Sequence, residues 1–318
     1  MDKNSTALES LILNKKDSIN LKDCYSTAGI EEILTTLDQE LIGLQDVKNR
    51  IREISSVLLL DYIREIKELN TLNTSLHMSF TGRPGTGKTS VAKKFGLILR
   101  SLGFLSKGHI TTVTREDLVG QYVGHTAPKT KEQLNQARGG ILFIDEAHHL
   151  YKPDNERDYG SEAIELLLQV MENQRDNLVF IFSGSKDKIN NFYNSNPGIS
   201  SRIGNHIDFL DYTTDELVEI TKFLLSNEIR YKFTDETISI LRFYIEQLQT
   251  FPAFTNVRTI RIFINQLLSY QSIRVEKELS EKGILTYKTL SEITKEDFKF
   301  FTKEDFINII GNENIKMF

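Results

Sequence analysis

The chain has 318 residues, of which 39% are hydrophobic, and its formal net charge is −5. This length favours a main domain with a smaller partner. The acidic balance argues against a general affinity for nucleic acid, because a phosphate polyanion requires a basic surface. The single cysteine, Cys24, excludes an internal disulfide and a cysteine-rich metal site, which suits a reducing compartment.

Membrane insertion and export signals are also not expected. No apolar stretch approaches the roughly 18 residues that a bilayer-spanning helix needs. The first residues lack the apolar core of a secretory signal. A transit peptide is rich in arginine and poor in acidic residues, whereas this segment contains Asp2, Glu9 and Asp17. We therefore expect a soluble protein that either works in the compartment where it is made or has had its targeting signal removed.

The first elements in chain order are helical. Residues 1–18 are polar and show no sustained period, so we expect a loosely ordered extension there. Residues 19–74 form the next predicted segment, of helices and a linker. Within it, apolar positions recur near helical spacing from Ala28 to Ile66, with a break at Gly43.

Residues 75–211 show a different pattern, in which short apolar runs alternate with longer helical segments. The runs occupy residues 76–80, 109–113, 140–144, 178–182 and 206–209. This alternation predicts a parallel sheet covered by helices, which is the architecture of an α/β nucleotide-binding domain.

Residues 212–318 predict a smaller helical domain, because no strand is expected after about Tyr212. The sequence TKEDF occurs twice near its end, at 294–298 and 302–306. A threonine followed three residues later by an aspartate can form a capping box at a helix start. We therefore predict two short capped helices and assign no chemistry to the repeat.

A phosphate-binding loop is the strongest motif. Residues 82–89, GRPGTGKT, fit G-x-x-x-x-G-K-[ST] and lie between a predicted strand and a predicted helix, the context that the motif requires. Glycines allow backbone N–H groups to turn inward, and the helix N-terminus adds positive potential. Lys88 is expected to reach the β and γ phosphates of ATP, and the Thr89 hydroxyl to bind Mg²⁺. The predicted nucleotide contacts are Gly82, Arg83, Pro84, Gly85, Thr86, Gly87, Lys88, Thr89 and Ser90.

Two acids follow the strand predicted at 140–144. Asp145 can hold the Mg²⁺ shell, and Glu146 can orient and deprotonate a water that attacks the γ phosphate. The pair favours ATP hydrolysis over transfer to a small acceptor. His148 and His149 come next, but adjacent histidines are not expected to point at one ion and no cysteine or third histidine completes a tetrahedral set. Packing or solvent contact near the nucleotide is expected instead.

With the phosphate loop, the Asp-Glu strand and a helical end in this order, the chain resembles AAA+ ATPases. It is similar in particular to the red-type Rubisco activases, the CbbX family. The similar stretches are ELIGLQDVKNRIREI, LHMSFTGRPGTGKTSVAKKF, VTREDLVGQYVGHTAPKTKEQL, LFIDEAHHLYKPDNERDYGSEAIELLLQVMEN and SNPGISSRIGNHIDFLDYTTDEL. The resemblance covers approximately residues 24–300.

The resemblance implies an ATP-driven ring, usually a hexamer. Such rings engage the C-terminal tail of the Rubisco large subunit through pore loops and release tightly bound sugar phosphates. The resemblance also implies that ribulose bisphosphate is an allosteric ligand. No transit peptide is visible and the composition suits an AT-rich genome, so we expect a plastid-encoded protein of the stroma, with a bacterial cytoplasm as the alternative.

Further residues acquire roles only through the resemblance. Tyr122, with Val123, falls at the aromatic position of the pore loop, where an aromatic ring can grip a chain with little sequence preference. Gly120 and Gly124 are expected to let this loop swing. Residues 152–160 are a second candidate pore segment, for which a solvated charged loop is almost as good an interpretation.

The resemblance also assigns residues that sense or complete the nucleotide site. Arg202 matches an arginine finger that reaches the nucleotide of a neighbouring subunit, and Arg258 matches a sensor arginine of the lid. Ser185 stands at a polar sensor position where relatives more often have an aromatic residue. His148 and His149 stand where tyrosines are more usual.

These departures leave other functions open. The chain is either a homo-oligomer or one subunit of a mixed ring, in which a paralogue supplies most hydrolysis and this subunit is regulatory or structural. A third interpretation is an AAA+ remodeller of another protein. DNA clamp loading is disfavoured, because the balance is acidic and no DNA-reading motif is present.

Overall fold

The computed structural model describes residues 3–14, 18–71, 75–152, 158–173, 177–228 and 230–310. The chain forms two compact units. Residues 1–82 and 87–209 make up the first unit, and residues 83–86 and 210–318 make up the second, called the lid unit below. The phosphate loop is therefore divided between the two units.

The first unit is built on a five-stranded parallel sheet with the strand order β2-β3-β4-β1-β5. The strands are β1 (Met78–Gly82), β2 (Ile110–Val113), β3 (Ile141–Ile144), β4 (Val179–Gly184) and β5 (Asn205–Phe209). All five strands expected from the apolar runs are present. Because parallel strands need crossover connections, a helix separates most of them in the chain.

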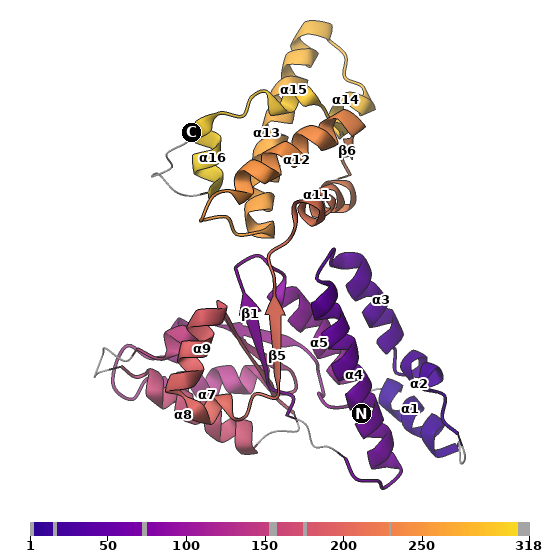
Figure 1. Cartoon of the computed structure of the whole chain (residues 1–318), viewed down its shortest axis with the longest axis vertical. Helices are drawn as coiled ribbons and strands as arrows, with labels where there is room; N and C mark the ends of the chain where they lie inside the picture. The colour runs from indigo at the N-terminus through magenta and orange to yellow at the C-terminus, as the bar shows by residue number, and fades with distance from the viewer. Residues whose placement is uncertain are drawn as a thin grey trace. The chain divides into compact units, whose positions relative to one another are not determined.

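Helices cover the sheet on both faces, with α4 and α5 on one side and α7, α8 and α9 on the other (Figure 1). The helices between the strands are α5 (Lys88–Ser101), α6 (Arg115–Leu118), α7 (Thr126–Ala137), the 3₁₀ helix η1 (Ala147–Leu150), α8 (Gly160–Asn173), α9 (Lys186–Ser195) and α10 (Pro197–Ser200). The predicted α/β architecture is confirmed.

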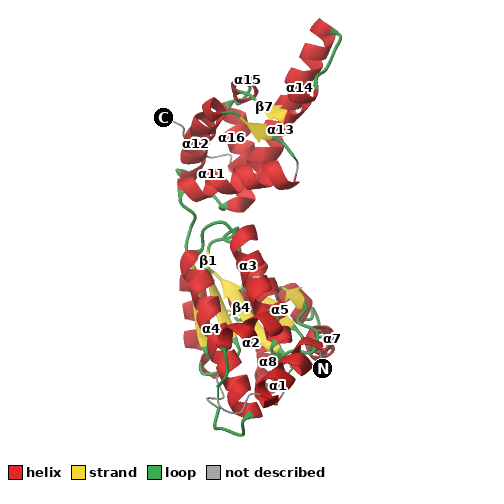
Figure 2. Cartoon of the chain, turned by 90° about the vertical axis from the view of Figure 1, so that its right-hand side faces the viewer, coloured by secondary structure: helices red, strands yellow, loops and turns green. Residues whose placement is uncertain are grey.

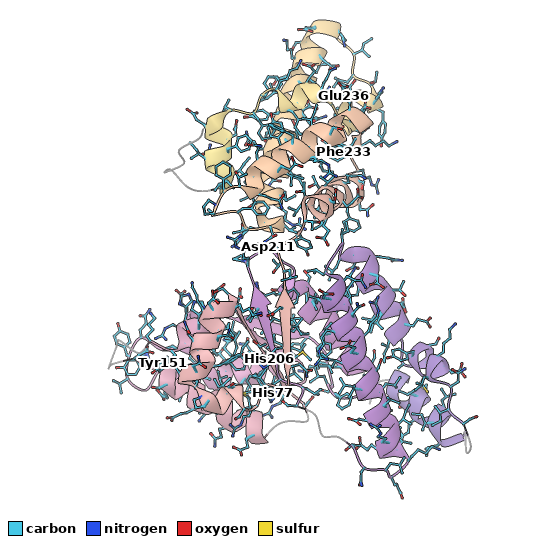
Figure 3. All side chains as sticks on the ribbon, in the orientation of Figure 1. His77, Tyr151, His206, Asp211, Phe233 and Glu236 are labelled. Carbon is cyan, nitrogen blue, oxygen red and sulfur yellow. The ribbon has the colours of Figure 1, made fainter. Side chains whose placement is uncertain are left out.

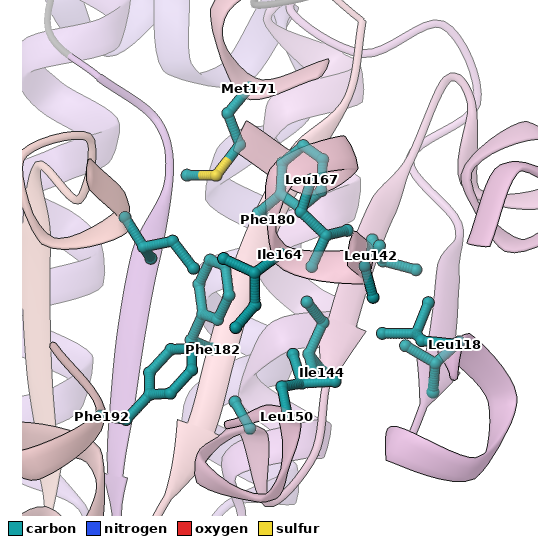
Figure 4. Packing of buried hydrophobic residues seen from close by; sticks show 14 of the residues in the cluster. Leu118, Leu142, Ile144, Leu150, Ile164, Leu167, Met171, Phe180, Phe182 and Phe192 are labelled. Atoms are coloured by element: carbon teal, nitrogen blue, oxygen red, sulfur yellow. The ribbon is translucent and has the colours of Figure 1, made fainter. Parts of the chain in front are cut away.

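The core between the sheet and α7 to α9 is apolar and tightly packed. Figure 4 shows Phe180 and Phe182 of β4 facing Ile164 and Leu167 of α8. All of β4 is buried, as is usual for a central strand of a parallel sheet that is covered on both faces. This core holds the carboxyl ends of β1, β3 and β4 in fixed register, and those ends carry the predicted site residues.

Residues 3–14 are helical, which corrects the expectation of a loosely ordered extension at residues 1–18 for that part of the segment. The N-terminal helices are α1 (Lys3–Asn14), α2 (Leu21–Thr27), α3 (Ile30–Glu40) and α4 (Gln45–Ile66). Leu8 and Ile12 of α1 are fully buried, so tertiary packing stabilises a segment whose own sequence gives only a weak helical period.

The lid unit is mainly helical, as predicted. Its helices are α11 (Thr214–Phe223), a π-helical turn (Leu224–Glu228), α12 (Asp235–Gln249), α13 (Val257–Lys282), α14 (Tyr287–Ser291), α15 (Lys295–Phe298) and α16 (Lys303–Ile310). The expectation that strands stop after about Tyr212 is wrong in one detail. A short parallel pair joins β6 (Lys232–Phe233) to β7 (Glu292–Ile293), and Figure 2 shows β7 in yellow among the red helices. Two-residue strands give no periodic signal in a sequence.

Both TKEDF segments begin with threonine-aspartate caps. Asp297 accepts hydrogen bonds from the backbone N–H of Thr294 (2.7 Å) and the hydroxyl of the same residue (3.3 Å). Asp305 does the same for Thr302, at 2.6 and 2.7 Å. Only Asp297 also binds a guanidinium, because Arg274 Nε lies 2.6 Å from its Oδ1 and Asp297 is fully buried.

This difference predicts unequal effects on stability. Asp297→Ala is expected to lower the free energy of unfolding by about 3 kcal/mol, since it removes the fully buried partner of the Arg274 guanidinium and leaves the partly exposed Glu278 as its ion-pair partner. Asp305→Ala, which removes a cap and the hydrogen bond that Gln266 Nε2 donates at 3.1 Å but breaks no ion pair with a guanidinium, is expected to cost about 1–2 kcal/mol. Denaturant unfolding of both variants checks this prediction, and equal costs would contradict it.

Within the ranges described above, no helix is both long enough and apolar enough to cross a bilayer.

Candidate nucleotide site and neighbouring loops

The phosphate loop requires glycine at specific positions. Gly82, Gly85 and Gly87 all have positive φ angles, of 148°, 76° and 95°. A Cβ on Gly82 would lie 2.3 Å from the carbonyl oxygen of Phe209, and a Cβ on Gly85 would lie 2.1 Å from that of Thr255. No other residue fits these positions without moving the backbone. The loop therefore has the tight backbone course of an anion cradle, which fits a nucleotide phosphate.

The basic and hydroxyl groups of the motif begin α5. Lys88 is buried, and its Nζ donates a hydrogen bond of 2.8 Å to the carbonyl oxygen of Gly82. Thr89 follows at the second helical position, half-buried. An ammonium and a hydroxyl at the N-terminus of a 14-residue helix are suitable groups for a phosphate and its Mg²⁺ ion.

The middle of the loop belongs to the lid unit. The carbonyl of Gly85 accepts the N–H of Val257 at 3.3 Å, and the Tyr212 hydroxyl donates to the carbonyl of Thr86 at 3.3 Å. The exposed Arg83 forms an ion pair with Asp211 at 3.3 Å. Residues 83–86, which are predicted to contact phosphate, are thus held by groups of the lid unit. The motif alone gave no sign of these partners.

Pro84 of the loop and Ser90 of α5 are exposed.

Asp145 and Glu146 lie directly after β3. The Asp145 N–H donates 2.8 Å to the carbonyl of Val113 at the end of β2, and its Oδ1 accepts the Glu146 N–H at 3.1 Å. Glu146 has a left-handed backbone, with φ 47° and ψ 46°. That conformation is uncommon for a residue other than glycine and turns the chain sharply into η1. Both carboxylates are half-buried.

The paired histidines follow Glu146 in different surroundings, because the His148 side chain is only 13% exposed and His149 is exposed. His148 Nδ1 lies 3.4 Å from Glu146 Oε2, and the two histidine rings have centroids 4.1 Å apart. Burial, then His149 and Lys188, lowers the pKa of His148 to about 4, so its ring is neutral at physiological pH. Ligand atoms of Glu146, His148 and His149 all lie within 4.8 Å of one another, a grouping that the sequence analysis did not expect.

Ser185 is half-buried just after β4 and begins α9, although its side chain makes no capping bond to that helix. Two residues earlier, the hydroxyl of Ser183 is buried with no hydrogen-bond partner in the described part of the chain. Gly184 between them contacts the histidine region, since a Cβ there would lie 3.4 Å from His148 Nδ1. The sensor role of Ser185 stays a prediction.

The loop before α7 exposes an aromatic ring on a fixed base. Tyr122 is 66% exposed and Val123 is 81% exposed. The N–H of Gly120 binds Thr126 Oγ1 at 3.1 Å, and Thr130 Oγ1 binds the carbonyl of Leu118 at 2.8 Å, so α7 anchors the base of the loop.

Only one of the two loop glycines has space for a side chain. A Cβ on Gly120 would lie 2.5 Å from the Cβ of His125, whereas one on Gly124 would meet nothing within 4 Å. A side chain would therefore not fit at Gly120, which packs closely against His125, and the swing of the loop about both glycines stays a prediction. The ring of Tyr122 meets that of His125 edge-on at 5.5 Å. The second candidate pore segment, 152–160, has its central residues, 153–157, outside the described residues.

Arg115 is a residue that the sequence analysis missed. Its Nη1 donates to the carbonyls of His149 (2.8 Å) and Leu150 (3.1 Å), and its guanidinium pairs with Asp158. The side chain thereby fixes η1, the turn that follows Glu146. The only sequence signal was the position of Arg115 shortly after β2. This strand pairs with β3, and β3 leads into Glu146 and η1.

The two predicted arginines lie in different units. Arg202 follows α10, and its guanidinium donates to the carbonyl of Gly198 (2.7 Å) and to Glu172 Oε2 (3.1 Å). Arg258 is exposed near the start of α13 in the lid unit, and the Cβ built on Gly85 lies 3.0 Å from its backbone nitrogen. The phosphate contacts of both side chains stay predictions.

Comparison with known proteins agrees with this geometry. Residues 78–209 match the family model of the ATPases associated with various cellular activities (AAA), and residues 213–306 match an AAA lid domain. A CfxQ homologue of Galdieria sulphuraria is 55% identical over 90% of this chain and 92% of its own. The chain belongs to the CbxX/CfxQ family of AAA ATPases.

Other members extend the comparison. A chloroplastic ribulose bisphosphate carboxylase/oxygenase activase of Cyanidioschyzon merolae is 53% identical over 83% of this AAA ATPase and 90% of the relative. The chromosomal CbxX protein of Cupriavidus necator is 50% identical, over 87% of each chain. The FIGL-1 AAA domain bound to ADP shares the fold, with a TM-score of 0.53, 14% identity and coverage of 84% and 81%. The chain is an ATPase that binds nucleotide in its AAA domain.

Proposed function

We propose that this AAA ATPase remodels inhibited Rubisco, using ATP hydrolysis to move a pore loop against the C-terminal tail of the large subunit. The observation that carries the proposal is Tyr122, an exposed ring on an anchored loop in the same unit as Lys88 and Glu146. Relatives named as Rubisco activase share about half of its residues. A hexameric ring in a plastid stroma, with ribulose bisphosphate as an effector, is part of the proposal.

The hydrolysis step assigns a role to each group. Bound Mg²⁺ would neutralise phosphate charge and orient the γ phosphate. Thr89 and Asp145 supply the oxygen ligands that such an ion prefers. Lys88 would exchange its bond to the Gly82 carbonyl for a phosphate oxygen. Glu146 would take a proton from the attacking water.

The lid unit would sense the nucleotide through the loop that it holds. Phosphate contacts to residues 83–86 compete with, or realign, the bonds from Tyr212 and Val257. Arg258, the residue after the loop's partner Val257, would add a direct phosphate contact. Hydrolysis at the γ phosphate would in this way change the hydrogen bonds by which the lid unit holds residues 83–86.

Removal of the Tyr122 ring tests whether Rubisco reactivation can be lost while ATP hydrolysis is kept. Tyr122→Ala is expected to leave ATP turnover within about twofold and to lower Rubisco reactivation by about tenfold or more, the size expected when an aromatic anchor is truncated. The assay is recovery of carboxylation by sugar-phosphate-inhibited red-type Rubisco with ATP and ribulose bisphosphate, with the chain alone and with any paralogue.

Two controls sharpen this test. Tyr122→Phe keeps the ring and is expected to retain reactivation. Tyr287→Ala removes a comparably exposed tyrosine, 74% accessible, from the lid unit and is expected to change neither activity. Normal reactivation by Tyr122→Ala would refute the pore-loop role, and no reactivation by the wild type in any combination would refute the Rubisco target.

A regulatory role in a mixed ring is favoured by two features of the hydrolysis centre. The buried His148 ring beside Glu146, together with Ser185 at the sensor position, makes the hydrolysis centre unusual. A regulatory subunit of a mixed ring would show weak turnover alone and stimulate turnover when mixed with a paralogue. Measuring turnover of the separate and mixed chains distinguishes the two functions.

A further inference from the structure

We propose that Glu146, His148 and His149 form a binding site for one divalent transition-metal cation of the Zn²⁺ type. A cation bound there would hold the Glu146 carboxylate and so stop ATP hydrolysis. The binding site rests on geometry alone, whereas the inhibitory effect rests on the proposed role of Glu146 as the base.

The spacing of the donor atoms supports the site. One ligand atom from each of the three side chains lies within 4.8 Å of the other two. His148 Nδ1 and Glu146 Oε2 are 3.4 Å apart. Two ligands bonded at tetrahedral zinc distances lie about 3.3 Å from each other. One edge of a zinc tetrahedron therefore already has the required length.

His148 itself lacks any other partner that the structure describes. Both of its ring nitrogens are buried without a hydrogen bond among the described residues, and its side chain is only 13% exposed. An unpaired buried polar atom costs free energy, so such atoms need an explanation in a folded protein. A metal ion would satisfy one nitrogen.

His149 can complete the third position. Its exposed ring has its centroid 4.1 Å from that of His148, and one of its ring nitrogens lies within 4.8 Å of the ligand atoms of Glu146 and His148. The backbone beneath does not need to move, because Arg115 holds the carbonyls of His149 and Leu150. Water would fill the fourth position, as in open zinc sites.

The donor set selects the class of cation. Two imidazoles and one carboxylate suit Zn²⁺, Ni²⁺, Co²⁺ or Cu²⁺, whereas Mg²⁺ prefers oxygen ligands and keeps several waters. The site is therefore distinct from the predicted Mg²⁺ position at Thr89 and Asp145. The nearby Lys188 ammonium opposes a cation, and the Glu146 carboxylate offsets its charge.

Binding is tested first without activity. The full chain, free of any histidine tag and stripped of metal, is titrated with Co²⁺, and the visible spectrum is followed; Zn²⁺ is then added to displace it. The wild type is expected to bind one ion per chain. His149→Gln, at an exposed position where folding is not at risk, is expected to weaken binding by about tenfold or more.

The matched control is His206→Gln. Figure 3 shows His206 on β5, where its exposed ring lies outside the cluster. This variant is expected to bind Co²⁺ like the wild type. No cobalt spectrum in the wild type, or equal affinity in His149→Gln and the wild type, would overturn the site.

Inhibition is tested second. Zn²⁺ is added to Mg²⁺-ATP turnover assays at a level that saturates the wild-type site, and turnover is expected to fall by about tenfold or more in the wild type and less than about twofold in His149→Gln. Unchanged wild-type turnover with the site saturated would overturn the inhibitory effect. Glu146→Gln, assayed without Zn²⁺, reports separately on the proposed base, so the two failures are distinguishable.

Discussion

Glu146→Gln is expected to lower ATP turnover by about 10² to 10⁴-fold while ATP binding persists. Glutamine keeps the size and the hydrogen bonding of the side chain but cannot accept the proton of the attacking water. Lys88, Thr89 and Asp145 are unchanged, so the groups assigned to phosphate and Mg²⁺ remain. Steady-state phosphate release measures the turnover, and a fluorescent ATP analogue measures the binding.

The control for this variant is Glu165→Gln. Glu165 is an exposed carboxylate on α8, and its neutralisation makes the same change in net charge. It is expected to leave turnover unchanged. If Glu146→Gln hydrolysed ATP at the wild-type rate, another group would have to activate the water, and the assignment of Glu146 would be wrong.

Arg202→Ala is expected to lower turnover by about 10³ to 10⁵-fold if the side chain serves as a finger for a neighbouring subunit. The guanidinium is positioned but only partly enclosed, because Gly198 and Glu172 hold it while 26% of the side chain stays exposed. A group that must reach another chain needs both properties. Arg138→Ala, at an exposed arginine before β3, is the matched control.

Mixing two inactive chains tests whether Arg202 acts on a neighbour. Arg202→Ala chains keep Glu146, and Glu146→Gln chains keep Arg202. Where the two meet in a ring, one interface combines an intact base with an intact finger, so mixing is expected to recover part of the turnover. An absence of recovery, with mixed assemblies confirmed by native mass spectrometry, would place the action of Arg202 within its own chain.

Local patterns predicted most of the nucleotide-binding domain. The five apolar runs became the five strands, because a strand buried on both faces needs a continuous apolar segment. The capping boxes at Thr294 and Thr302 also formed as expected, since a cap depends on residues three apart. The two-stranded β6–β7 pair was missed, because its strands are short and lie about 60 residues apart.

The site was predictable only where it is continuous in the chain. Residues 82–89 and the pair Asp145 and Glu146 were found because each is a contiguous motif after a strand. Arg115, the lid partners of residues 83–86 and the contact between His148 and Gly184 were not predictable, since each joins segments far apart in the sequence.

The sequence by itself determined the AAA family, the identity of the phosphate loop and the order of strands along the chain, because these depend on residue type and short spacing. The tertiary structure alone decided the spatial strand order, in which β1 lies between β4 and β5, and the convergence of Glu146, His148 and His149. The left-handed backbone of Glu146 begins the tight η1 turn that carries both histidines, with His148 packed against β4. Such a conformation results from packing between distant segments, which no local pattern records.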